Sequence, residues 1–167
     1  MRSLAALLLL TAATPEEQVL AVADALAAAE AATTRKSLLD ATDRLEKLGA
    51  RGELPGDRRA AAGRRASVPW RGRASGPAFR HGELPGGGEM ATEQIFLAGE
   101  SAVVAVVPGG NRALSVRITG PDGSAVCEQR VAPPRAACRW VPVFTRRFRI
   151  TVANPAGDPA RYYLVSN

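Results

Sequence analysis

The spacing of short apolar segments in the last part of the chain constrains the fold more than any other feature. From Glu93 to the C-terminus, about seven such segments follow one another, roughly one per ten residues, with turn residues between them. This spacing leaves no room for crossover helices, so the strands must be antiparallel. Residues 114–119 and 148–152 alternate apolar and polar side chains, which is typical of strands with one buried face. The pattern predicts an antiparallel all-β sandwich.

One segment of this region is apolar on both faces. Residues 102–107 read AVVAVV, a run that predicts a strand covered on both sides. Tyr162 and Leu164 are expected to complete the inner face near the C-terminus. We expect residues 90–167 to be the folding unit, with a modest core that does not need the rest of the chain.

The N-terminus has the pattern of a secretory signal peptide. Arg2 supplies a short positive region, residues 4–10 are apolar, and residues 11–13 are small. The apolar run is too short to span a bilayer comfortably, and no cysteine follows it to carry a lipid anchor. We therefore predict a signal peptide over residues 1–13. The alternative is a buried turn at the start of the next helix.

Two capping patterns predict helices after the signal peptide. Thr14 is placed to cap a helix that starts at Pro15, with Glu17 in the capping-box position. Ser37 and Asp40 form a second capping pattern. Two thin amphipathic helices cannot close a core alone, so they must pack elsewhere, pair with another chain or stay partly ordered. The expected helices span residues 15–33 and 37–48, ended by Gly49, within a helical segment over residues 14–49.

Residues 50–89 form a linker by composition. They lack a hydrophobic period and are rich in arginine, glycine and proline, which is typical of a disordered tether. The pentapeptide GELPG occurs at residues 52–56 and 82–86. It is either a docking motif or a product of the biased composition. Trp70 and Phe79 lie among arginines, a pattern that fits stacking on bases or adhesion within a tether.

Arginine carries almost all of the positive charge in a chain whose formal net charge is +6. Guanidinium groups match phosphate and carboxylate groups, so polyanions are one class of partner to consider. Arg117, Arg147 and Arg149 are candidate polyanion-binding residues, because strand alternation places Arg147 and Arg149 on one outward side. The alternatives are a solvated face, or a GC-rich genome that favours arginine, alanine, glycine and proline codons together.

Cys127 and Cys138 are the two cysteines of the chain, and they lie on consecutive predicted strands joined by a proline-containing loop. Neighbouring antiparallel strands can bring Cα atoms into the disulfide range, and an exported protein matures in an oxidising compartment. We predict a disulfide between them, the alternative being two buried free thiols. The spacing fits neither a CxxC redox motif nor a zinc site, and we expect no metal and no cofactor.

A family resemblance is carried by three segments of this region. They read FLAGESAVVAVV, ALSVRITGPDGSAV and FRITVANPAGDPARYYLV, and together they resemble the bacterial pre-peptidase C-terminal domain over residues 93–166. The resemblance implies a jelly-roll-like sandwich appended to exported proteins, many of them proteases, with a non-catalytic role in secretion, adhesion or substrate contact. This sequence departs from that pattern, because no protease domain stands ahead of the segment. Asp122 stands nearly alone in its turn, so no calcium site is carried over.

No catalytic constellation is visible in the sequence. The one histidine, His81, lies in the predicted linker, and no nucleophile elbow, phosphate-binding loop or zinc-protease motif occurs. We therefore expect a non-enzymatic protein, an exported β-sandwich binding or accessory module in the periplasm or outside the cell. Its expected partner is a protein or an envelope or extracellular polymer, and not a nucleic acid. The alternative is an envelope structural protein that oligomerises or docks a partner through its N-terminal helices. Polyanion binding through the arginines is a third hypothesis.

Export and disulfide formation should occur together, and mass spectrometry of the native protein tests both. We expect the mature protein to begin near Ala13 and to weigh two hydrogen atoms less than the reduced chain, because the exported chain folds in an oxidising compartment. An intact Met1 together with two alkylatable thiols would contradict this prediction.

Overall fold

The computed structural model describes residues 13–62 and 76–167. Residues 1–12 of the predicted signal peptide and residues 63–75 of the predicted linker, Trp70 among them, lie outside the described residues. The described elements are, in chain order, α1 (Pro15–Ala31), α2 (Arg35–Lys47), α3 (Gly56–Ala62), β1 (Ala78–Leu84), β2 (Glu89–Phe96), β3 (Ala102–Pro108), β4 (Leu114–Thr119), β5 (Ala125–Val131), β6 (Ala136–Trp140), β7 (Arg146–Ala153) and β8 (Ala160–Ser166).

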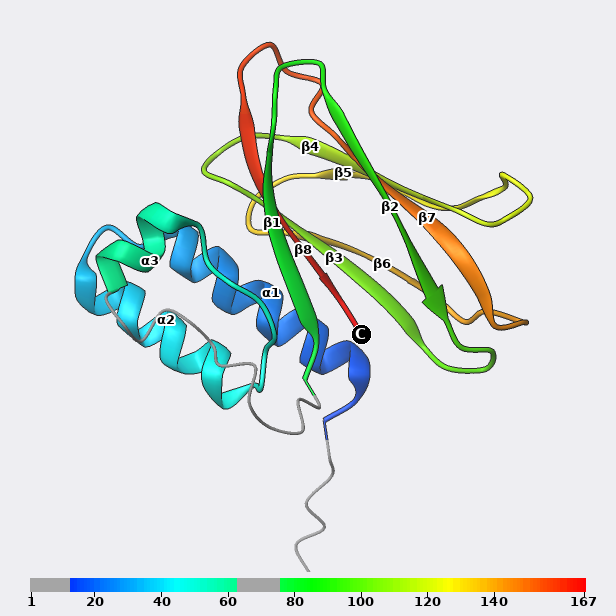
Figure 1. The fold of residues 1–167 in the computed structure, drawn as a ribbon, viewed down its shortest axis with the longest axis horizontal. Helices are drawn as coiled ribbons and strands as arrows, with labels where there is room; N and C mark the ends of the chain where they lie inside the picture. Colours follow the sequence, from blue (N-terminus) through cyan, green and yellow to red (C-terminus); the bar gives the residue numbers. More distant parts are fainter. Residues whose placement is uncertain (1–12, 63–75) are drawn as a thin grey trace, which may run out of the picture.

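The strands of the described part form two four-stranded antiparallel sheets with jelly-roll connectivity (Figure 1). One sheet has the strand order β1-β8-β3-β6 and the other β2-β7-β4-β5. The strand pairs are nested in the sequence, as in one long hairpin folded over itself. The outermost pair is β1–β8, followed inward by β2–β7, β3–β6 and β4–β5. Gly123 turns the chain between β4 and β5 with a φ of 79°, where glycine is unstrained. The predicted all-β sandwich behind a helical segment is confirmed.

The sheets begin earlier in the chain than the sequence indicates. Strand β1 and helix α3 both lie inside residues 50–89, the predicted linker. A boundary at residue 90 would cut β2 and would remove β1, which pairs with β8 along its whole length. Phe79 and Leu84 of β1 are buried, but the polar and glycine residues between them hide the strand pattern. This corrects the predicted linker and the predicted start of the folding unit.

The main core fills the space between the two sheets. Alternation on β4 and β7 points Ile118 and Ile150 inward, where neither is accessible to solvent. Tyr162 and Leu164 complete the inner face from β8, as the sequence predicts. The alternating pattern therefore identified the inward residues of these strands correctly.

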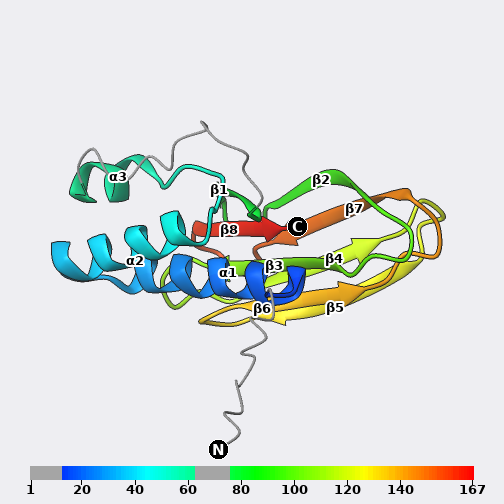
Figure 2. The same cartoon turned by 90° about the horizontal axis from the view of Figure 1, so that it is seen from below.

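Helix α1 covers the outer face of the β1-β8-β3-β6 sheet and adds a third layer (Figure 2). Strand β3 is buried at every position, because its alternate residues face the other sheet and the helix. The apolar stripe of α1 enters this second core, where its three largest side chains, Val19, Val22 and Leu26, are fully buried. The helices are therefore part of the folded unit and are not an appendage to the sandwich.

The first helix begins as predicted, and the second begins earlier. Thr14 and Glu17 form a capping box at the start of α1. At α2 the cap is Thr34, whose hydroxyl accepts a hydrogen bond from the backbone N–H of Ser37 at 3.1 Å. The Ser37 hydroxyl accepts one in return from the Thr34 N–H at 3.3 Å. Serine and threonine both cap helices well, so the local sequence did not distinguish the two starts.

The two cysteines lie at disulfide distance, with Cα atoms 6.0 Å apart. Cys127 lies on β5 and Cys138 on β6, which are edge strands of different sheets. The bond therefore joins the two sheets along one side of the sandwich, while the β1–β2 connection closes the opposite side. In the chain-entropy account, a closed loop of this length contributes on the order of 3 kcal/mol.

Both copies of GELPG serve internal packing. Leu54 and Leu84 are buried in the two cores. At Gly52, a Cβ atom would overlap the Phe79 carbonyl oxygen and lie 2.8 Å from ring carbons of the same residue. Gly82 lies in the same way against the ring of Tyr162. The repeated glycine allows a close approach that a larger residue would prevent.

A hydrogen-bonded ion cluster joins the helices to β8. The Tyr163 hydroxyl donates to Oε2 of Glu30 at 2.9 Å, and Tyr163 is fully buried. Arg58 of α3 and Arg161 of β8 approach the same carboxylate to 3.7 and 3.8 Å. Burial, followed by the negative charge of Glu30, raises the pKa of Tyr163. One carboxylate of α1 thus ties together three elements that are distant in sequence.

Replacing Gly52 by alanine tests the packing role of the repeat. Gly52→Ala should lower the free energy of unfolding by about 2 kcal/mol, because the Phe79 backbone must move to admit the methyl group. The matched control is Gly56→Ala, whose Cβ meets nothing within 4 Å and which should be neutral or slightly stabilised. Urea unfolding measures both, and equal stabilities of the two variants would speak against the packing role.

The Tyr163 hydroxyl should make stability fall at high pH. Its hydrogen bond to a charged group makes Tyr163→Phe less stable by about 2 kcal/mol at pH 7. In the unfolded chain the Tyr163 phenol ionises near pH 10. In the folded protein its pKa is raised, so the hydroxyl keeps its proton at that pH. The hydroxyl therefore contributes its full amount to the free energy of unfolding below about pH 10, and this contribution falls by about 1.4 kcal/mol per pH unit above it. Urea unfolding from pH 7 to 11 should show the difference between the two proteins shrinking above pH 10. A constant difference would sink the prediction.

Candidate functional site

The outer face of the β2-β7-β4-β5 sheet is the candidate site, and we call it the open face. Within the described ranges the helices gather on the other sheet and leave this face exposed (Figure 2). Alternation points polar side chains outward from all four of its strands. The polar residues of the open face are Glu89, Glu93, Ser115, Arg117, Thr119, Glu128, Arg130, Arg147, Arg149 and Thr151.

The three arginines singled out in the sequence lie together on the open face. Arg117 is on β4, and Arg147 and Arg149 are on the adjacent strand β7. In the register of these strands Arg117 lies opposite Thr151, and Arg149 lies opposite Thr119. All three guanidinium side chains are exposed to solvent.

Carboxylates from the two neighbouring strands balance most of this positive charge. Arg117 donates to Oε1 of Glu128 on β5 at 2.8 Å, and this hydrogen bond raises the pKa of the Arg117 guanidinium. Arg147 lies 3.5 Å from Glu93 on β2. Among the residues described, Arg130 and Arg149 have no carboxylate within ion-pair distance. A polyanion would therefore meet a surface of mixed charge with Arg130 and Arg149 as its most available cations.

A groove of about 440 Å³ runs over the centre of the open face. Three hydroxyl groups line it beside two guanidinium and two carboxylate groups. Such a lining offers many hydrogen-bond donors and acceptors at short spacing, which suits a ligand rich in hydroxyl or acidic groups. Its lining residues are Glu89, Ser115, Val116, Arg117, Thr119, Glu128, Arg149, Thr151 and Ala153.

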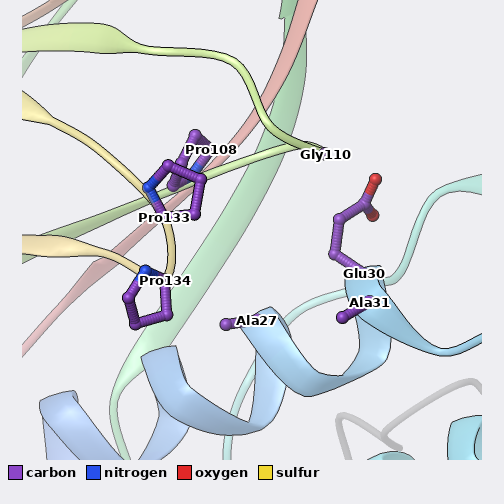
Figure 3. A pocket seen from close by; sticks show the side chains of 7 residues that line it. All are labelled: Ala27, Glu30, Ala31, Pro108, Gly110, Pro133 and Pro134. Atoms are coloured by element: carbon purple, nitrogen blue, oxygen red, sulfur yellow. The ribbon is translucent and has the colours of Figure 1, made fainter.

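A second hollow, of about 370 Å³, lies between α1 and two loops of the sandwich (Figure 3). Pro108 is the last residue of β3 and Gly110 lies in the β3–β4 connection, while Pro133 and Pro134 come from the β5–β6 connection. The proline rings face Ala27 and Ala31 of the helix (Figure 3). A volume of this size suits a small apolar group. The sequence did not indicate this pocket, because three separate segments build it.

Glu30 contributes the one carboxylate of this proline-lined pocket. Its side chain accepts the Tyr163 hydrogen bond and lies close to Arg58 and Arg161. The carboxylate therefore already has partners of opposite charge, and its role in the described structure is to hold α1 against the sheet.

The residues considered for catalysis and metal binding lie apart from one another. His81 lies on β1, exposed, with its ring 6.3 Å from that of Tyr163. Asp122 accepts hydrogen bonds from the backbone and hydroxyl of Ser124, which lower the pKa of its carboxyl group. In residues 13–62 and 76–167, no group of three or more His, Cys, Asp or Glu residues is placed to hold a metal ion. Nor does any helix of that part have the length and apolarity to cross a membrane.

No protein-family model matches the chain, and no curated protein matches it. The similar solved structures include the pre-peptidase C-terminal domain of a collagenase from Bacillus anthracis, the family that the sequence resembles. That structure is 11% identical and covers 53% of this chain and 87% of its own, with a TM-score of 0.45. A mitogen from Yersinia pseudotuberculosis is also 11% identical. The match covers 55% of this chain and 84% of the mitogen, with a TM-score of 0.47. A periplasmic inhibitor of g-type lysozyme from Aeromonas hydrophila is 14% identical. The match covers 55% of this chain and 84% of the inhibitor, with a TM-score of 0.43. None of these likenesses assigns a role to this chain.

Proposed function

We propose that this protein is a non-catalytic, exported β-sandwich binding module. Its open face contacts an envelope or extracellular polymer, and the rest of the molecule serves to support that face. The resemblance to the pre-peptidase C-terminal domain points to the same class of role, in secretion, adhesion or substrate contact.

The observation that carries the proposal is the difference between the two sheets. One sheet has its outer face covered by α1, which buries apolar residues on both sides of β3. The other has an exposed outer face with a groove of about 440 Å³ lined by hydroxyl, guanidinium and carboxylate groups. A rigid sheet is a good platform for a binding site, because its backbone fixes the spacing of the exposed side chains.

The alternative function, oligomerisation or docking through the helices, has less support. The apolar stripes of α1 and α2 are used inside the chain, since Val22, Leu26 and Leu45 are fully buried. The outward residues of α2 are mostly charged or polar, for example Arg35 and Lys36. A helix whose apolar stripe is already buried has little apolar surface left for a partner helix.

Of the two arginines that line the groove, Arg149 is better placed for an acidic ligand, because Arg117 already has a carboxylate partner. Arg117 and Arg147 already have carboxylate partners at 2.8 and 3.5 Å, and such exposed pairs are weak. An acidic polymer would compete for all three guanidinium groups, and its binding would weaken as salt screens the charges.

Titration with a heparin fragment tests the proposed use of the open face, with a neutral dextran fragment as the comparison probe. At low ionic strength we expect heparin to shift backbone amide signals of β4 and β7. Arg149→Ser should weaken binding about tenfold, the equivalent of one charge-assisted hydrogen bond. Arg35→Ser removes the same charge from α2 and should leave the affinity unchanged.

The position of the shifted signals decides between the functions. Shifts confined to α1 and α2 would support the helical docking surface and overturn the proposal. The absence of any shift on the open face with either probe would also count against it.

A further inference from the structure

The end of the sandwich formed by the β2–β3 and β6–β7 loops carries a cluster of exposed apolar side chains. Val143 is 80% exposed and Phe144 is 60% exposed. Of the large apolar residues that the described structure leaves exposed, all but Val126 belong to this cluster. We call this cluster the apolar tip, and it consists of Ile95, Leu97, Val141, Val143 and Phe144.

The two loops of the apolar tip are held together by hydrogen bonds. The Gly99 N–H donates to the Pro142 carbonyl at 2.9 Å. The Ala98 N–H donates to the Thr145 hydroxyl at 3.0 Å. Both loops lie at the end of the sandwich away from α2 and α3 (Figures 1 and 2). The exposed side chains therefore stand on one connected platform.

An aromatic cluster supports this platform from inside the sandwich. The rings of Phe96 and Trp140 pack edge to face with centroids 4.7 Å apart, and Phe148 lies 5.3 Å from Trp140. Phe96 and Trp140 are the last residues of β2 and β6, directly before the two loops. A base of packed aromatic rings keeps the apolar tip in place, so its exposure is a fixed property of the fold.

Positive charge lies beside the apolar tip. The Arg146 guanidinium lies 4.8 Å from the centre of the Phe144 ring, and Arg147 follows it at the start of β7. Glu93 lies 3.5 Å from Arg147 and two residues before Ile95, and Glu100 lies in the β2–β3 loop, three residues after Leu97. Protruding apolar side chains with arginine at their base match the chemistry of an anionic bilayer surface, where apolar groups enter and guanidinium groups contact phosphates.

We propose that the apolar tip inserts into the interface of an anionic lipid bilayer. A side chain that is 80% exposed protrudes from its neighbours, and a soft bilayer accepts such a protrusion without a complementary cavity. The apolar tip adjoins the open face, because Ile95 pairs with Arg147, but its most exposed residues, Val143 and Phe144, belong to the β6–β7 loop. This proposal therefore goes beyond the proposed function. A module attached in this way would keep the open face accessible to a polymer.

Vesicle flotation of the full chain tests the proposal. The vesicles contain phosphatidylglycerol and phosphatidylethanolamine, and phosphatidylcholine vesicles serve for comparison. The wild-type protein should bind the anionic vesicles, and Val143→Ser/Phe144→Ser should weaken that binding at least about tenfold, because the inserting groups are lost. Val126→Ser removes an exposed valine from β5, outside the apolar tip, and should bind as the wild type does.

Each outcome of this experiment decides for or against the proposal. Since the replaced side chains are exposed, the double variant should keep the wild-type circular dichroism, and it should keep its response to heparin at the open face. A wild-type protein that binds no vesicles, or a double variant that binds as well as the wild type, overturns the proposal. A concentration-dependent dimer that the double variant loses, without vesicle binding, would assign the tip to self-association instead.

Discussion

The burial of β3 on both faces is the constraint on which the rest of the molecule depends. A strand with apolar residues at every position must lie between two other layers, and here those layers are the second sheet and α1. The sandwich alone would leave Val103, Val107 and Tyr163 exposed to water. The alanine-rich α1 is thin enough to lie close to the sheet, and its few large residues fill the space above β3. The sheet therefore needs α1 to keep the apolar side chains of its outer face away from water.

This arrangement makes the two sides of the sandwich chemically different. The covered side carries a cluster of charges around Glu30, which holds the helices to β8, and further ion pairs join α1 to the β6 side of the sheet. The open side distributes its charges over the surface in cross-strand pairs such as Arg117 with Glu128. Charges of the first kind stabilise the fold, while charges of the second kind remain free to exchange partners with a ligand.

The alternating strands were predictable from the sequence because each carries its own signal. Strands β4 and β7 alternate cleanly, and their inward residues were identified correctly. Tyr162 and Leu164 of β8 were also identified, although this strand is buried at almost every position. Strand β1 was missed because its burial depends on pairing with β8, which lies at the other end of the chain. Residues 141–144, VPVF, have the apolar composition of a strand. Pro142 has no N–H to donate to a neighbouring strand, however, and β6 ends at Trp140. Local pattern therefore predicted the strands with their own alternation, and failed where a distant partner decides the structure.

The candidate site was likewise predictable from the sequence only in part. Alternation was enough to place Arg147 and Arg149 on one side of a strand. The carboxylates of Glu93 and Glu128 were not foreseen, because the register of separate strands brings them to the arginines. The proline-lined pocket needs three segments to meet and has no local signal at all.

The nested strand pairing has a consequence for the order of assembly. The β4–β5 hairpin joins neighbours in sequence, whereas β1 must wait for β8, which is separated from it by all of the other strands. Helix α1 packs on β3 and β8, so this helix finds its full docking surface only after β8 has been made. During synthesis α1 and β1 therefore wait for a partner until the ribosome has passed every strand between them and β8.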